Sequence, residues 1–195
     1  MHDLAPFHRW QPAYLAEEDE RSPFFRQEKD RMYYSQAIYN YFIHPDWDAF
    51  GSSTLYMKVL YADYLEGFVI IELIGEWNDC LHNDIMYLKR RVVDYMMPEG
   101  IHKYILICEN VLNFHGSDDC YYEEWQEEAL EEGGWICCIN TLKHVAEEME
   151  GTRLQYFMHF GDSFNGVEWR MQKPKWVFKA VEALVYRGSG QLRCG

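Results

Sequence analysis

Two short apolar runs decide the fold of this chain: residues 104–108 read Tyr-Ile-Leu-Ile-Cys, and residues 135–139 read Trp-Ile-Cys-Cys-Ile. Neither run alternates with polar residues, which is typical of β-strands covered on both faces. Segments with helical periodicity separate and flank them, and strands that alternate with helices predict a mostly parallel sheet. We therefore expect two strands, centred on Leu106 and Ile136, to lie side by side beneath covering helices.

A β-hairpin is expected to open this sheet. Residues 55–64 alternate as a half-buried strand should, with one face formed by Leu55, Met57, Val59 and Tyr61. A short turn, Leu65-Glu66-Gly67, leads to a second apolar strand over residues 68–74. The hairpin adds one antiparallel strand to the sheet.

Helical patterns alternate with strands from residue 83 onward. We expect helices over residues 83–97, 118–132, 142–149 and 174–187, the last beginning at Pro174, and a final strand over residues 154–160. The order from residue 54 is then ββαβαβαβα. This order predicts an α/β fold with a mostly parallel sheet and helices packed against it.

The first fifty residues differ from the rest in sequence pattern, because they do not show the alternation of strands and helices. Ser22-Pro23 is typical of a helix start, and Phe25, Met32, Gln36, Tyr39 and Ile43 then lie on one helical face until Pro45 ends it. We interpret residues 1–50 as an aromatic-rich helical arm and residues 51–195 as the α/β domain. The arm either packs on its own domain or is exchanged in a dimer.

The charged residues of the chain limit the classes of partner that it is expected to bind. Asp and Glu number 32 against 18 Lys and Arg, which gives a net charge of -14. The electric field of so negative a protein disfavours binding to nucleic acid and to anionic membrane surfaces, and it favours binding to a basic partner. No apolar run is long enough to span a bilayer and no secretory signal is recognisable, so a cytoplasmic location with six free thiols is expected.

The order of elements from residue 54 to 187 is similar, at fold level, to the STAS domains of anti-anti-sigma factors. Sigma-regulating STAS domains carry Asp-Ser-Ser-Gly after a buried parallel strand, whereas this chain reads His115-Gly116-Ser117-Asp118. Only Ser117 matches, at the second serine, and this departure argues against a phosphorylation switch. The resemblance implies a non-enzymatic binding module.

Polar side chains that could act in catalysis or bind a ligand follow the predicted strand at 104–108. Glu109, His115, Ser117 and Asp118 would lie at the carboxyl end of a parallel strand, where open α/β sheets bind ligands. His, Ser and carboxylate groups can transfer protons or ligate a metal. Glu76 and Asp79 follow the second hairpin strand and are expected to share that edge. The structural alternative is a capped loop with a solvated histidine.

Recognised catalytic motifs are missing. No Gly-x-Ser-x-Gly elbow occurs, and the aspartates before Cys120 should raise the pKa of that thiol, which disfavours a Cys-His hydrolase. No motif indicates a bound cofactor or a metal. The helix over residues 118–132 holds eight acids and no base, so it either faces solvent or docks a basic partner.

Three functional hypotheses follow. The first is a non-catalytic protein-interaction or regulatory module, which binds a protein partner or associates with itself. The second is a small-molecule or metal-dependent enzyme with its site in the loop 109–120. The third, suggested by the Met and aromatic content, is a carrier of apolar ligands.

Overall fold

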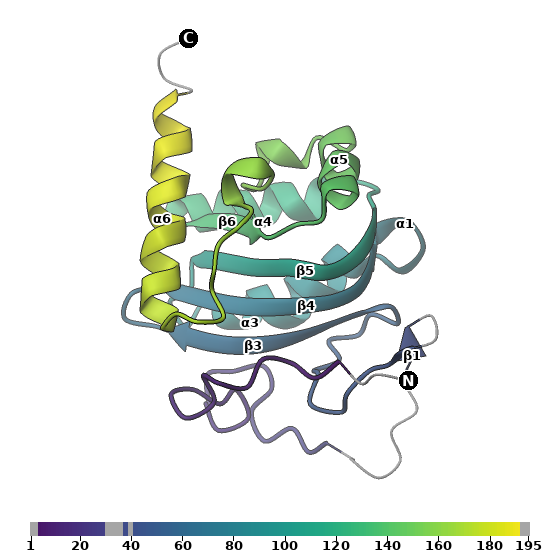
Figure 1. Cartoon of the computed structure of the whole chain (residues 1–195), viewed down its shortest axis with the longest axis vertical. Helices are drawn as coiled ribbons and strands as arrows, with labels where there is room; N and C mark the ends of the chain where they lie inside the picture. The colour runs from purple at the N-terminus through teal and green to yellow at the C-terminus, as the bar shows by residue number, and fades with distance from the viewer. Residues whose placement is uncertain (1–3, 30–36, 39–40, 192–195) are drawn as a thin grey trace.

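The computed structural model describes residues 4–29, 37–38 and 41–191. Its centre is a four-stranded sheet in the order β3-β4-β5-β6 (Figure 1). The strands are β3 (Leu55–Asp63), β4 (Phe68–Asn78), β5 (Lys103–His115) and β6 (Trp135–Ile139). β3 pairs antiparallel with β4, and β4, β5 and β6 run parallel. The predicted α/β class, with a mostly parallel sheet opened by a hairpin, is confirmed.

The two deciding strands are neighbours. Tyr104 pairs with Ile136, and Leu106 pairs with Cys138. All five residues of β6 are buried, and Cys137 and Cys138 point into different core clusters on the two faces of the sheet. Both cysteines are packing residues, as expected from their adjacency in a strand.

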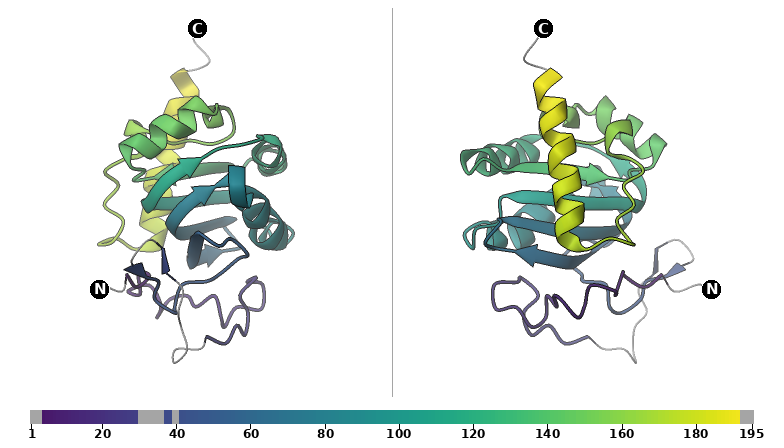
Figure 2. Two further views of the ribbon diagram at one scale, coloured as in Figure 1. Left: turned by 90° about the vertical axis from the view of Figure 1, so that its right-hand side faces the viewer. Right: turned by 60° about the vertical axis from the view of Figure 1, so that its left-hand side comes forward.

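Helices cover both faces of the sheet (Figure 2). One face carries α1 (Asp79–His82), α2 (Asp84–Leu88), a π-helical turn η1 (Lys89–Val93), α3 (Asp94–Met96) and α4 (Cys120–Glu131). α5 (Lys143–Gly151) lies at the β6 edge of the sheet (Figure 1), and its buried residues join the core cluster on this face. The long α6 (Pro174–Gln191) packs on the other face through Val177, Phe178, Val181 and Val185. The predicted helices at 83–97, 118–132 and 142–149 are therefore present, and the last helix continues beyond Gly188.

The predicted strand over residues 154–160 is wrong. Arg153 adopts a left-handed conformation, with a φ of 65°, and is followed by the 3₁₀ turn η2 (Leu154–Tyr156). Leu154 and Met158 are buried in one cluster at helical rather than strand spacing. A single parallel bridge, from Cys137 to His159, pairs this segment with β6. A second 3₁₀ turn, η3 (Asp162–Phe164), precedes α6.

The hairpin differs from expectation at one position. A bulge between Val59 and Tyr61 shifts the register of β3, so that Tyr61 packs on the face of α6 while Leu55, Met57 and Val59 pack on the other face. A bulge reverses the side to which the following residues point. β3 is also buried on both faces over most of its length, and the N-terminal segment runs along its outer edge (Figure 1).

The predicted helix in the first fifty residues is also wrong where the structure describes the chain. The Ser22 hydroxyl accepts a hydrogen bond from the Phe24 N–H, and Arg26 has a φ of 56°, so residues 22–26 form turns instead of a helix. Residues 37–38 and 41–42 form the short strands β1 (Ala37–Ile38) and β2 (Tyr41–Phe42). Met32, Gln36 and Tyr39 lie outside the described residues.

The arm packs on its own domain. Trp10 is buried in the core cluster beneath α6, and its indole N–H donates to the Gln172 carbonyl at 2.9 Å. Phe24 is buried in the cluster on the opposite face. Both contacts join the arm to the core of the α/β domain.

Candidate functional site

The carboxyl edge of the sheet is more regular than the sequence suggested. β5 extends to His115, so Glu109 and His115 lie in a strand, and the predicted loop begins only at Gly116. Val111 and Phe114 are buried, which explains why β5 continues through a stretch rich in Asn and Glu. Glu76 lies in β4 and accepts a hydrogen bond from the Asn113 amide at 3.0 Å.

Asp79 does not face this edge. It is buried beneath α4, and its carboxylate accepts hydrogen bonds from the Tyr122 hydroxyl at 2.6 Å, the Ile85 N–H at 2.8 Å and the Trp77 indole N–H at 3.1 Å. Burial raises the pKa of Asp79 to about 6, although these donors oppose the shift. With three protein donors already bound, the carboxylate joins α1, α2 and α4.

The remaining predicted residues are exposed. His115, Ser117 and Asp118 face solvent at the start of α4, where the Asp118 carboxylate accepts the Cys120 N–H at 3.1 Å. The pKa of the Cys120 thiol is raised by desolvation and by the Asp118 charge, as the sequence predicted. Among five surface hollows formed by described residues, with volumes of about 230 to 750 Å³, only one is lined by a predicted residue, Glu109.

Glu109 belongs instead to a junction on the face covered by α6. Its carboxylate binds the Arg170 guanidinium and accepts the Trp169 indole N–H at 3.2 Å. The same guanidinium lies 3.4 Å from the carboxylate of Glu72, whose other oxygen accepts the Phe7 N–H at 2.8 Å. Glu72 therefore joins the arm to the segment before α6.

Sequence reasoning missed Glu72. Its residue exposure is 1%, and burial raises its pKa from 4.5 to about 7, with Phe7 and Arg170 opposing the shift. The available signal was a lone carboxylate inside the apolar run Phe68–Ile74. A buried carboxylate of that kind requires nearby donors, but the sequence does not show that Phe7 and Arg170 supply them.

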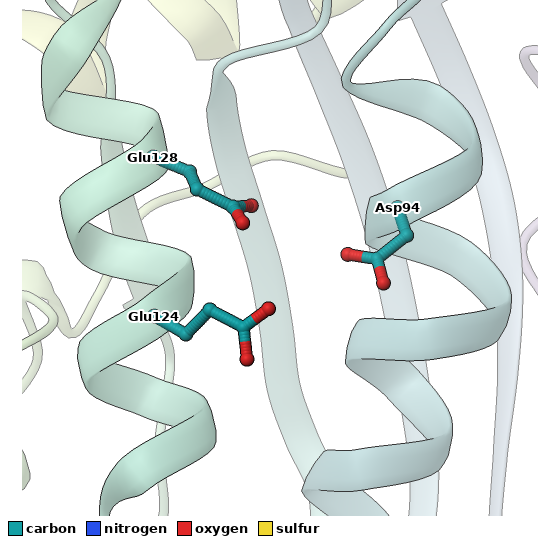
Figure 3. A group of neighbouring side chains, drawn as sticks. All are labelled: Asp94, Glu124 and Glu128. Carbon is teal, nitrogen blue, oxygen red and sulfur yellow. The ribbon is translucent and has the colours of Figure 1, made fainter.

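A cluster of carboxylates lies between α3 and α4. Asp94, Glu124 and Glu128 bring one oxygen each within 4.8 Å of one another (Figure 3). The ammonium group of Lys89 contacts all three and lies 2.8 Å from Glu128. Although burial lowers the pKa of Lys89, its hydrogen bonds to Asp94 and Glu128 outweigh that effect and raise it. The cation of this cluster is therefore a lysine of the chain itself.

The acids of α4 fall into two rows. Glu124 and Glu128 face η1, where Lys89 and Arg90 neutralise them. Glu123, Glu127 and Glu131 are four residues apart, are exposed, and form no ion pair with any cation of the described chain. We call these three residues the free acidic ridge. One turn of helix separates successive carboxylates, so the ridge spans about 12 Å.

A hollow of about 750 Å³ adjoins the ridge. It lies near the amino ends of β4 and β5, between α3 and the end of α4, and we call it the acidic hollow. Its lining combines four acids with apolar and aromatic groups: Tyr64, Asp94, Met97, Pro98, Gly100, His102, Glu128, Glu131 and Glu132. Glu131 belongs to both features, so hollow and ridge form one continuous anionic surface.

Fold and surface together define an α/β protein with a hairpin-opened, mostly parallel sheet and an acidic face. No protein-family model and no curated protein matches the chain. Among solved structures, it is similar to one described as an anti-sigma factor antagonist from Thermotoga maritima. The two share 15% sequence identity over 48% of this chain and 79% of the other, with a TM-score of 0.38. The likeness is limited to part of the fold outline.

In the part of the chain that the structure describes, no helix is long and apolar enough to cross a membrane.

Proposed function

We propose that this protein is a non-catalytic interaction module that binds a basic segment of a partner protein on the acidic hollow and the free acidic ridge. The observation that carries the proposal is the separation of the two acid rows of α4. One row is neutralised within the chain, and the other is exposed and forms no ion pair with a base in the described ranges 4–29, 37–38 and 41–191. A net charge of -14 adds a long-range attraction for a basic partner.

The spacing of the ridge favours an extended partner. Carboxylates four residues apart on a helix are about 6 Å apart. Alternate side chains of an extended strand recur at nearly the same interval, about 6.6 Å. A segment with Lys or Arg at every second position can therefore place successive cations against Glu123, Glu127 and Glu131.

The hollow adds an apolar component. Tyr64, Met97 and Pro98 line it beside the acids, so the methylene stem of a lysine or arginine can pack there while its charged end meets Glu131 or Glu132. This combination favours a basic peptide over a bare metal ion.

An enzyme centred on residues 109–120 has less support. Asp79 and Glu109 are saturated by protein donors, and His115, Ser117 and Asp118 line none of the five hollows. A catalytic site needs its groups within hydrogen-bond reach of one reacting atom. The carboxylates of Asp79 and Glu109 instead hold different segments of the fold together, and the exposed loop is separate from both.

The test is a titration with a fluorescent peptide of alternating lysine and glycine, followed by anisotropy. We expect saturable binding that weakens as salt rises. The triple substitution Glu123→Gln, Glu127→Gln and Glu131→Gln should weaken it about tenfold, at a few tenths of a kcal/mol per charge.

A matched control removes the same total charge from other exposed positions: Glu20→Gln, Glu150→Gln and Glu168→Gln. This variant should bind nearly as tightly as the wild type. Equal losses in the two variants would mean that net charge alone attracts the peptide, and the proposal would fail. Tighter binding of spermine or Ca²⁺ than of the peptide would also contradict it.

A further inference from the structure

A second concave site lies on the opposite face of the sheet, between the arm and the start of α6. Its volume is about 530 Å³, within the range of small-molecule sites. We call it the arm–helix pocket. Its lining comprises Arg9, Trp10, Pro12, Ala13, Tyr61, Arg170, Met171, Gln172, Lys173, Pro174 and Lys175. Three separate stretches of chain thus meet around one hollow.

The charge of this pocket is opposite to that of the protein. Four of its lining residues are Lys or Arg and none is acidic, in a chain with 18 bases and 32 acids. Bases gathered around one hollow of so acidic a molecule are unexpected from composition alone. They mark a place where an anion would meet positive charge.

Two of the four cations are held by acids outside the lining. Lys175 lies 2.7 Å from Asp63, and Arg170 is bound by Glu109 behind the pocket. Within the described chain, Arg9 and Lys173 have no acidic partner. Arg9 extends toward the segment before α6, where its Nη1 lies 3.3 Å from the Met171 sulfur. Among the described residues, the pocket is therefore lined by one unpaired positive charge from the arm, Arg9, and by one from the start of α6, Lys173.

The lining also offers apolar surface. Trp10 is held in place by its hydrogen bond to Gln172 and by edge-on contact with Phe7, at 5.3 Å between ring centroids. Met171 is 71% exposed and lies in the lining beside Trp10. A ligand that covers Met171 and contacts Trp10 would remove this apolar area from water.

The start of α6 adds to the attraction for anions. The Lys173 carbonyl accepts the N–H groups of Trp176 and Val177, which places Lys173 at the amino end of an 18-residue helix. The dipole of a helix this long favours negative charge at that end. The effect reinforces Arg9 and Lys173, which supply most of the charge.

We propose that the arm–helix pocket binds a small amphipathic anion, with one carboxylate or phosphate group attached to an apolar body. The anionic group meets Arg9 and Lys173, and the body lies against Trp10 and Met171. A bare inorganic anion would leave the apolar lining unused, and an uncharged apolar molecule would leave the two cations unused. Both parts of the ligand are required.

The experiment uses three probes of equal chain length, decanoate, decanol and decylammonium, together with inorganic phosphate. Binding is measured by calorimetry on the full chain. Decanoate should bind with one site, and the other three should bind at least tenfold more weakly. Hydrogen exchange should show decanoate protecting residues 9–13 and 170–175.

Variants separate this site from general charge effects. The pair Arg9→Gln and Lys173→Gln should weaken decanoate binding about tenfold, because two charge contacts are lost. The control pair Lys143→Gln and Arg187→Gln removes the same charge from exposed positions elsewhere and should leave binding unchanged. Decanol binding as tightly as decanoate, phosphate doing so, or equal losses in both variant pairs would each overturn the proposal.

Discussion

The carboxylate of Glu72, in the middle of the sheet, accepts the backbone N–H of Phe7 in the arm at 2.8 Å. Its other oxygen faces Arg170, so one buried group joins two segments that are distant in sequence. A titratable group at such a junction links the stability of the fold to pH.

Stability should fall as pH rises through the range between the unfolded and folded pKa values of Glu72. The folded pKa is about 7 and the ordinary value is 4.5. Between these values the folded chain holds a proton that the unfolded chain has lost, so rising pH favours unfolding. The contribution is roughly 3 kcal/mol, complete below about pH 4.5 and lost above about pH 7.

The variant Glu72→Gln isolates this contribution, because an amide oxygen can still accept the Phe7 N–H. Urea unfolding of Glu72→Gln between pH 5 and 8 should show a smaller decrease in stability than the wild type, and the decrease that remains should come from Asp79, whose pKa is also raised. The exposed control Glu150→Gln should show the full decrease expected of the wild type. Identical pH profiles for wild type and Glu72→Gln would show that Glu72 does not titrate in this range.

Lys89 should be essential to the carboxylate cluster of Asp94, Glu124 and Glu128. Replacing it by Met leaves three carboxylates around a position where the lysine side chain is 0% exposed. The carboxylates left behind are 30 to 40% exposed, so water screens their mutual repulsion and the loss should be about 1 to 2 kcal/mol. Chemical unfolding of Lys89→Met measures this loss.

The same variant should gain affinity for a divalent cation. With the ammonium gone, the three oxygens within 4.8 Å can coordinate Ca²⁺. Millimolar Ca²⁺ should therefore raise the melting temperature of Lys89→Met while leaving that of the wild type unchanged. An equal shift in both proteins would mean that Lys89 does not occupy the position a cation would take.

Asp79 and His115 should behave in opposite ways on substitution, although sequence reasoning placed both at one site. Asp79→Ala leaves the Tyr122, Ile85 and Trp77 donors without their acceptor, so it should destabilise the fold by about 3 kcal/mol. His115→Ala removes an exposed ring and should change stability by less than about 0.5 kcal/mol. Comparable losses for the two variants would contradict the structural assignment of Asp79.

Two adjacent glycines after α4 test the pairing of β5 with β6. A Cβ on Gly134 would lie 1.8 Å from the His102 carbonyl oxygen, whereas a Cβ on Gly133 would meet nothing within 4 Å. Gly134→Ala should therefore cost about 2 kcal/mol or more. Gly133→Ala should cost only about 1 kcal/mol, from its φ of 68°. Equal effects in thermal unfolding would argue against this close approach of the strands.

The sequence predicted the parts of the fold that depend on local pattern. The runs around Leu106 and Ile136 are strands because nothing polar interrupts them, and α4 forms because Trp125 and Ala129 recur at helical spacing. Prediction from the sequence failed where tertiary contacts determine the secondary structure. Residues 109–115 are a strand because Val111 and Phe114 find a core. Residues 154–158 turn because Leu154 and Met158 pack together.

The candidate site was predicted less well than the fold. Placing Glu109 at the carboxyl end of the strand assumed a shared edge, but its side chain turns toward Glu72 and Arg170 on the face of α6. The acid-rich helix was recognised from its composition. Its division into a neutralised row and a free row depends on Lys89 and Arg90, which are about 35 residues earlier in the chain.

The most direct measurement of the proposed function is the map of amide chemical shifts as the alternating lysine peptide is added. Binding at the acidic hollow and the free acidic ridge predicts that the largest changes fall at residues 97–102 and 123–132, with few changes around Arg9 and Lys173. Changes spread evenly over all exposed acids, or confined to the opposite face, would contradict the proposed surface.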